Sequence, residues 1–266
     1  MLRDAAATVM NRFLRSWNGY GITCSKWKKK KPHTRELVDN RILEAYLDQN
    51  RRVRLYYDAM RKADVEWSDN FPKQCRFYSI QQMVEFVLDK RVDGDFAECG
   101  CWKGHSTYIV ASILSDRGFA NEFHVFDSFE GGLSEKHPQD KNKLRDETTS
   151  DMTQQKQVFA SSKGEVERTL AEFPFVKLYE GWIPDRFDEV EARQFCFVHV
   201  DVDLYQPTLN CLEFFYPRLS SGGVVVVDDY GYSAFPGAKR AVDEFLQRND
   251  HQMFYEVPVG GAFFIK

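Results

Sequence analysis

The chain lacks the features that would place it in several common classes of protein. No apolar run approaches the roughly 20 residues that a helix needs to cross a bilayer. None of the six cysteines forms a C-x-x-C pair, and the G-x-G-x-x-G pattern of dinucleotide sites is absent. A basic surplus is also missing, because the 266 residues carry a net charge of −4, which argues against nucleic-acid binding. Scattered cysteines without a recognisable signal peptide predict free thiols and a cytoplasmic location.

Charge is distributed unevenly along the chain. Residues 1–31 hold eight basic side chains and one acidic one, so this segment carries +7 and the remaining residues carry −11. Apolar residues recur within it at helical spacing, among them Val9, Phe13 and Trp17, which predicts a basic amphipathic arm. Three interpretations of the arm stay open: a helix packed on a partner, a peripheral helix on a membrane surface, and an organelle transit segment.

Beyond the arm, a helical segment precedes a longer region of alternating strands and helices. Helices are expected at 34–63 and 80–88, joined by a polar, aromatic link at 67–76. Residues 32–90 are therefore predicted to form a helical cap in front of one larger domain, residues 91–266.

In that domain, apolar runs predict strands and a 3.6-residue period predicts helices. The strands are 95–100, 122–127, 176–181, 195–202 and 222–229, the helices are 105–114, 164–173, 207–219 and 237–248, and a hairpin follows. This alternation predicts an α/β fold with a doubly wound, mostly parallel sheet and an antiparallel C-terminal hairpin. The polar stretch 130–161 is too long for an ordinary connection, so we expect an active-site lid or a disordered segment there.

Ligands of an open α/β sheet bind outside the carboxyl ends of its strands, so the residues at these ends are the candidates for a site. The first strand delivers Glu98, Gly100 and Gly104. Glycines let the backbone approach a ligand, and a helix beginning near His105 offers free N–H groups to an anion. A tight turn with a purely structural role is the alternative.

The next two strands end in residues suited to a nucleoside. The second strand ends in Asp127, at a position where an acid commonly binds the hydroxyl pair of a ribose. A helix cap or turn is the alternative role of this residue. The third strand ends at Gly181 and Trp182, where the indole is placed to flank a planar base.

Four aspartates follow the two most apolar strands: Asp201, Asp203, Asp228 and Asp229. If these strands are neighbours, the carboxylates crowd one corner, and their repulsion raises several pKa values unless a cation compensates. Hard oxygen ligands without a Cys or His motif indicate Mg²⁺ or a similar ion. In the alternative interpretation, the acids cap helices and pair with Lys239 or Arg240. His199 is expected to be a buried, hydrogen-bonded residue.

Five blocks, in this order, resemble the macrocin O-methyltransferase family over about residues 67–266. They are FAECGCWKGHST, VFDSFEG, HVDVDLY, GGVVVVDDY and GAKRAVDEF. Members of this family are metal-dependent enzymes that use S-adenosylmethionine to methylate sugar hydroxyls of natural products. The resemblance implies a class I methyltransferase fold with seven strands. The segment FPKQCRFYS (71–79) follows the family only loosely, which leaves the acceptor open, and residues 1–31 lie outside the resemblance.

The resemblance also implies roles for individual residues. Cofactor contacts are implied around Glu98, Gly100, Ser106, Asp127 and Ser128. Metal ligands are implied at Asp201, Asp228 and Asp229.

A metal ion on these ligands would lower the pKa of the acceptor hydroxyl, and a nearby carboxylate would take the proton. Asp203 is the free member of the set and shares a face with Asp201 if the strand continues through it. If the strand ends earlier, Asp201 is the alternative base in addition to being a ligand.

Other functions stay open at this point. A phenol or catechol is the chief alternative to a sugar as acceptor. A non-catalytic methyltransferase-fold scaffold recruited to membranes is the non-enzymatic alternative. An NAD-dependent oxidoreductase lacks the glycine pattern that it needs and leaves the aspartates unexplained. The sequence is also compatible with a homo-oligomer.

Overall fold

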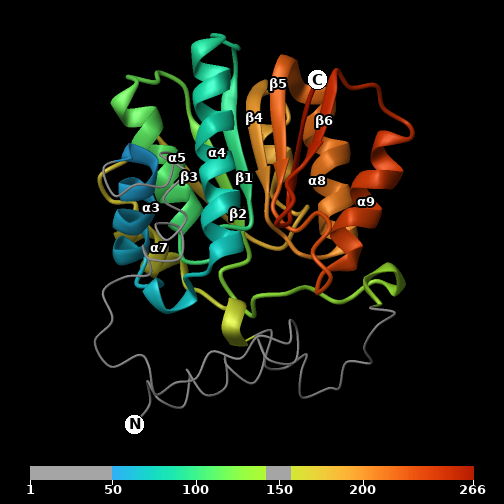
Figure 1. Ribbon diagram of the computed structural model, residues 1–266, viewed down its shortest axis with the longest axis horizontal. Helices are drawn as coiled ribbons and strands as arrows, with labels where there is room; N and C mark the ends of the chain where they lie inside the picture. The colour runs from blue at the N-terminus through green and yellow to red at the C-terminus, as the bar shows by residue number, and fades with distance from the viewer. Residues whose placement is uncertain (1–49, 142–156) are drawn as a thin grey trace.

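A seven-stranded sheet runs through the centre of the protein in the order β3-β2-β1-β4-β5-β7-β6 (Figure 1). The strands are β1 (Asp95–Cys99), β2 (Phe123–Asp127), β3 (Val176–Glu180), β4 (Phe195–Val200), β5 (Leu219–Val227), β6 (Met253–Glu256) and β7 (Ala262–Ile265). The first five pair in parallel, whereas β7 is antiparallel to both β5 and β6. The predicted doubly wound sheet with an antiparallel hairpin is confirmed.

The computed structural model describes residues 50–141 and 157–266. The predicted arm at 1–31, the first part of the helix predicted at 34–63 and the middle of the predicted lid lie outside the described residues. Within the described ranges, no helix combines the length and the apolar character needed to cross a bilayer.

Helices cover both faces of the sheet (Figure 1). They are α3 (Arg51–Lys62), α4 (Phe71–Asp89), α5 (His105–Asp116), α7 (Lys163–Thr169), α8 (Tyr205–Arg218) and α9 (Pro236–Leu246), with short 3₁₀ turns η3 (Glu66–Ser68), η4 (Pro138–Asp140) and η5 (Phe187–Val190). Because side chains alternate along a strand, Val224 and Val226 of β5 belong to the core cluster that includes residues of α3, α4 and α5, whereas Val225 and Val227 belong to the cluster that includes residues of α8 and α9. Both faces of the valine run are therefore buried, as expected for a central strand.

Helix α4 begins nine residues before the start that the sequence predicts. The side chain of Asn70 accepts a hydrogen bond from the backbone N–H of Lys73 at 2.9 Å, and Pro72 occupies the first turn, where its missing N–H costs nothing. The predicted link at 67–76 is thus wrong from Phe71 onward. Its polar residues concealed the helix because Lys73 and Gln74 are buried, which breaks the usual amphipathic pattern.

Candidate active site

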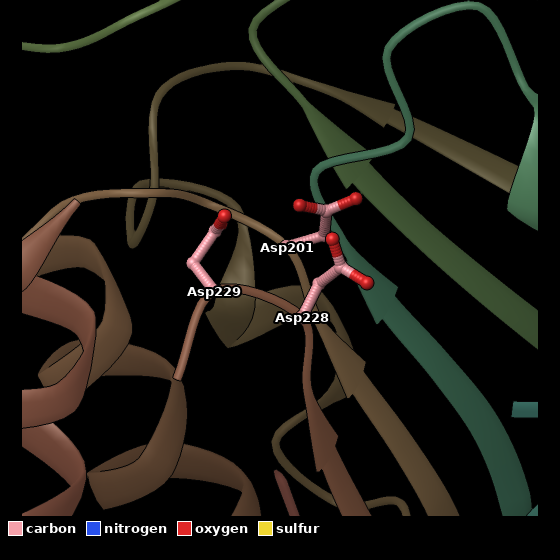
Figure 2. Close-up of side chains that lie close together, drawn as sticks. All are labelled: Asp201, Asp228 and Asp229. Carbon is pink, nitrogen blue, oxygen red and sulfur yellow. The ribbon is translucent and has the colours of Figure 1, made fainter. Parts of the chain in front are cut away.

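The aspartates meet at the carboxyl ends of β4 and β5. These strands are neighbours, and their last residues, Val200 and Val227, are partners in the register. One carboxylate oxygen from each of Asp201, Asp228 and Asp229 lies within 4.8 Å of the others (Figure 2). Both strands end before the acids, two residues earlier than the predicted ends at 202 and 229. We call the four residues Asp201, Asp203, Asp228 and Asp229 the acidic corner.

The electrostatics of the acidic corner favour a bound cation. Burial, followed by the negative charges of Asp228 and Asp229, raises the pKa of Asp201 well above its ordinary value. Burial, followed by the charges of Asp203 and Asp228, has the same effect on the pKa of Asp229. Oδ2 of Asp229 is buried without a hydrogen-bond partner among the described residues. Carboxylates in this state fit a divalent cation, which would offset the repulsion and bind the unpartnered oxygen.

Asp203 belongs to the corner but not to the group of three. Strand β4 ends at Val200, so Asp203 does not share a strand face with Asp201. The prediction that the strand continues through Asp203 is wrong. The backbone of Asp203 is left-handed, with φ of 61°. Burial and the charges of Asp201 and Asp228 raise the pKa of Asp203 well above its ordinary value.

A basic side chain from α4 reaches into the acidic corner. Nε of Arg76 donates to Oδ1 of Asp228 at 2.9 Å, and the two side chains are only 15% and 7% exposed. Lys239 instead pairs with Asp243 at 2.6 Å, and Arg240 donates to the carbonyl of Gln139. The alternative pairing of the acids with Lys239 or Arg240 is therefore wrong.

The glycine loop after β1 packs directly against the acidic corner. Gly100 has φ of 82°, and a Cβ at this position would lie 1.9 Å from the carbonyl oxygen of Asp201. Only glycine fits here, because the two loops are in backbone contact. Gly104, with φ of 83°, is the N-cap residue of α5.

Asp127 holds this glycine loop in place from the end of β2. Its Oδ2 accepts backbone hydrogen bonds from Cys101 at 2.8 Å and Trp102 at 3.0 Å, and its Oδ1 accepts one from Phe129 at 3.0 Å. Trp102 has φ of 48°, which is unusual for a residue with a side chain, and the bond to Asp127 fixes it there. A carboxylate offers about four acceptor positions, so one remains for a ligand.

Comparison with known proteins identifies the family. The chain matches the macrocin O-methyltransferase (TylF) family over residues 26–265. It belongs to this family. The demethyldecarbamoylnovobiocin O-methyltransferase of Streptomyces niveus is 29% identical over 205 residues, which are 73% of this chain and 75% of that protein. The 8-demethyl-8-(2,3-dimethoxy-α-L-rhamnosyl)-tetracenomycin-C 4′-O-methyltransferase of Streptomyces olivaceus is 32% identical over 167 residues, 60% of this chain and 61% of that protein.

Solved structures agree with this assignment. The O-methyltransferase NovP superposes with a TM-score of 0.58 and 26% identity, over 73% of this chain and 80% of that chain. The fold is that of class I methyltransferases, and the protein is an S-adenosylmethionine-dependent O-methyltransferase.

In this methyltransferase, the residues predicted for the cofactor follow the carboxyl edge of the sheet. Trp182 follows β3 and is half-buried, Asp127 ends β2, and Gly100 follows β1. Ser106, in the first turn of α5, and Ser128, after β2, are both buried. The structure thus brings these residues together in the strand order β3-β2-β1, beside the acidic corner on β4 and β5.

Glu98 is enclosed behind this edge. It is 0% exposed, its Oε1 accepts a hydrogen bond from Nδ1 of His199 at 2.8 Å, and its Oε2 accepts one from Thr107. The expectation that His199 is buried and hydrogen-bonded is confirmed. Since both oxygens of Glu98 are engaged within the protein, its contact with the cofactor stays a prediction.

A cavity of about 520 Å³ lies elsewhere, between α7 and the edge strand β3. Its lining includes Lys163, Tyr179 and Arg186 but none of the residues predicted for cofactor or metal. Strands β2 and β1 separate it from the acidic corner. We therefore locate the site by the chemistry of its residues rather than by the size of this cavity.

Proposed function

We propose that this methyltransferase methylates a hydroxyl of a sugar or glycosylated small molecule and requires Mg²⁺ or a similar divalent cation at the acidic corner. The observation that carries the proposal is the group of three carboxylates with oxygens within 4.8 Å, one of which has an unpartnered buried oxygen. The sugar acceptor is supported by the relatives, one of which is named for a rhamnosyl group. A divalent cation bound there supplies Lewis acidity, which lowers the pKa of an acceptor hydroxyl.

In this proposal, the edge of the sheet binds S-adenosylmethionine. The remaining acceptor position of Asp127 receives a ribose hydroxyl, and Trp182 flanks the adenine. Gly100 and Gly104 carry no side chain, so the backbone of the loop can approach the cofactor at these two positions. Ser106 and Ser128 supply further polar contacts at the same edge.

We infer that Asp203 is the general base, because it lies beside the three proposed ligands without belonging to their group. The substitution Asp203→Asn keeps the shape of the side chain and removes proton acceptance. It is expected to lower kcat by about 10²–10⁴, the usual contribution of a general base, and to leave Mg²⁺ affinity nearly unchanged. Asp228→Asn is the matched comparison and should weaken Mg²⁺ binding instead. A nearly wild-type Asp203→Asn enzyme would transfer the role of base to Asp201.

The function is tested with purified protein and labelled S-adenosylmethionine against a panel of glycosides and phenols. We expect label transfer to glycosides, abolished by a chelator and restored by Mg²⁺. Transfer to phenols alone would replace the sugar by a phenol as acceptor. Activity that a chelator does not reduce would remove the metal from the reaction.

We also infer a peripheral role for the basic arm, residues 1–31, whose +7 charge suits an anionic lipid surface. The division into this arm, a cap at 32–90 and a catalytic domain at 91–266 belongs to the same proposal. The proposal also includes an active-site lid at 130–161, a cytoplasmic location and assembly into a homo-oligomer.

A further inference from the structure

Lys73 places a buried amino group beside the glycine loop. The residue lies in the first turn of α4 and is only 9% exposed. Its Nζ donates to Oγ of Ser68 at 2.9 Å and lies 5.3 Å from the ring centroid of Trp102 and 5.4 Å from that of Phe77. Trp102 belongs to the loop that Asp127 holds, so Lys73 borders the proposed cofactor site.

The charge of Lys73 has no partner of opposite sign within ion-pair distance. Among the described residues, no carboxylate oxygen lies within 4.0 Å of Nζ. The nearby acid Asp69 is engaged elsewhere, because its carboxylate accepts hydrogen bonds from Gln74 and Tyr56. An ammonium group has three donors, and within residues 50–141 and 157–266 only Ser68 accepts a hydrogen bond from it. A buried charge without a counter-ion is costly, and burial, followed by the charge of Arg76, lowers the pKa of Lys73 to about 8.

The position of Lys73 identifies the part of the cofactor that it would meet. The residue lies near two regions of the site, since its amino group is 5.3 Å from the ring centroid of Trp102 and Arg76, on the next turn of the same helix, pairs with Asp228. In the proposed function, ribose binds at Asp127 and the methyl group is delivered at the acidic corner. The cofactor segment between these points is the sulfonium with its aminocarboxypropyl chain. The only anionic group of S-adenosylmethionine is the α-carboxylate of that chain.

We propose that Lys73 binds the α-carboxylate of S-adenosylmethionine and that Ser68 positions its amino group. The inference rests on the proposed placement of the cofactor along the strand ends. A carboxylate beside Nζ would supply the missing counter-ion and use the free donors of the ammonium group. The rings of Trp102 and Phe77 shield this contact from water, which strengthens a charge-assisted hydrogen bond.

The test compares S-adenosylmethionine with its decarboxylated analogue, which lacks only the carboxylate. Both are titrated by calorimetry into the full chain and into the Lys73→Met variant. We expect Lys73→Met to weaken S-adenosylmethionine binding by about 10- to 100-fold, the size of one charge-assisted hydrogen bond. The variant should bind the decarboxylated analogue with an affinity within about twofold of wild type, since this ligand has no carboxylate for Lys73 to bind. Lys90→Met, an exposed lysine at the other end of α4, is the matched control and should change neither affinity.

The outcomes separate this inference from the function on which it rests. Equal losses for both ligands, or no loss for either, would overturn the assignment of Lys73. A wild-type protein that binds neither ligand would instead overturn the proposed cofactor site. If Lys73→Met does not fold, Lys73→Gln serves for the same comparison, with thermal unfolding as the check on folding. Lys73→Arg, which keeps the positive charge, should retain part of the preference for the carboxylated ligand.

Discussion

Arg76 and Asp228 form a buried ion pair between the first part of the fold and the end of β5. The guanidinium also lies 5.8 Å from the ring centroid of Tyr232, and Gly261 leaves room for its side chain, since a Cβ there would lie 3.2 Å from Cδ of Arg76. The acidic corner holds four buried or half-buried carboxylates. Arg76 therefore offsets part of their mutual repulsion in the absence of a metal ion.

Replacing Arg76 should destabilise the protein more than replacing an exposed arginine. Arg76→Gln leaves Asp228 buried without its charge partner, so we expect the free energy of unfolding without divalent cation to fall by about 3–5 kcal/mol. Arg61→Gln is the control, because its pair with Asp58 is exposed and such pairs contribute about 1 kcal/mol or less. Denaturant titrations measure both values.

The same titrations repeated with Mg²⁺ test the proposed metal ligands. We expect Mg²⁺ to stabilise Arg76→Gln more than wild type, because the cation then replaces the positive charge that Arg76 supplies next to Asp228. Equal stabilisation of the two proteins would argue against Mg²⁺ binding at this corner.

His105 gives the stability of the protein a pH dependence of predictable sign. Its Nε2 donates to the carbonyl of Tyr56 at 3.1 Å, whereas its Nδ1 is buried without a partner among the described residues. Burial, followed by the charge of Lys73, lowers the pKa of His105 well below its ordinary value of 6.5. The unfolded chain therefore binds a proton at this residue before the folded protein does, and the contribution to stability is lost as pH falls below 6.5.

The expected effect is a smaller acid sensitivity in a His105 variant. His105→Gln keeps a donor for Tyr56 but does not titrate, so it should remove a slope of up to about 1.4 kcal/mol per pH unit between pH 6.5 and pH 5. Denaturant unfolding at several pH values measures the difference between variant and wild type. His251→Gln, at an exposed position, should keep the wild-type slope. Parallel curves for His105→Gln and wild type would contradict the assignment.

At the residue scale, the sequence predicted the acidic residues of the candidate site but not the basic residues beside them. The aspartates stand out because they follow apolar strand residues directly, as Asp228 follows Val227. Arg76 and Lys73 give no such signal, because a charged residue in a polar stretch ordinarily faces solvent. Their burial depends on the packing of α4 against the sheet, which local pattern does not reveal. Asn70 followed by Pro72 was the available sign of the helix start.

Helix α8 takes its N-terminal cap from a distant part of the chain. Leu204, its N-cap residue, provides no side-chain bond, and Oδ1 of Asp140 in η4 accepts from the backbone N–H of Tyr205 at 2.7 Å instead. Gly237 in α9 makes room for this arrangement. A Cβ at Gly237 would lie 1.7 Å from Oδ1 of Asp140 and 2.7 Å from the backbone nitrogen of Tyr205.

Replacing each of two helical glycines by alanine should therefore change the stability of the protein in opposite directions. Gly237→Ala is expected to destabilise the protein by about 1–3 kcal/mol through overpacking against Asp140. Gly164→Ala in α7 should stabilise it by about 0.5–1 kcal/mol, since the nearest atom to its Cβ lies at 3.8 Å and alanine favours a helix. Thermal or denaturant unfolding measures both changes. A neutral Gly237→Ala would show that η4 can move away from α9 at little cost.

At the element scale, the sequence predicted the strands well because the central sheet is buried on both faces. The valine run of β5 is an example, although this strand also includes Leu219 to Ser221, whose polar residues concealed its start. The contact of η4 with α8 and α9 was not predictable. It joins Asp140 to residues 65 or more positions away, and no local pattern specifies such a partner.

For the whole molecule, the largest difference in net charge is between the arm, residues 1–31, with +7, and the remaining residues, with −11. Deleting residues 1–31 should leave transfer to a soluble acceptor within about twofold of the full chain, because the residues proposed for cofactor and metal lie outside the arm. Binding to vesicles that contain anionic lipid should decrease, as sedimentation would measure. Sedimentation unchanged by the deletion would leave the arm a packing or targeting role. Vesicles of neutral lipid are the matched control.

The ion pair between Arg76 and Asp228 also has a consequence for the order of events during synthesis. The two residues are 152 positions apart. At about 5–20 residues per second, the ribosome needs roughly 8–30 s to reach Asp228 after Arg76 has been made. During this time α3, α4, β1 and α5 have emerged, whereas the carboxylates of Asp228 and Asp229 do not yet exist. The acidic corner is therefore among the last parts of the protein to assemble, after most of the sheet that supports it.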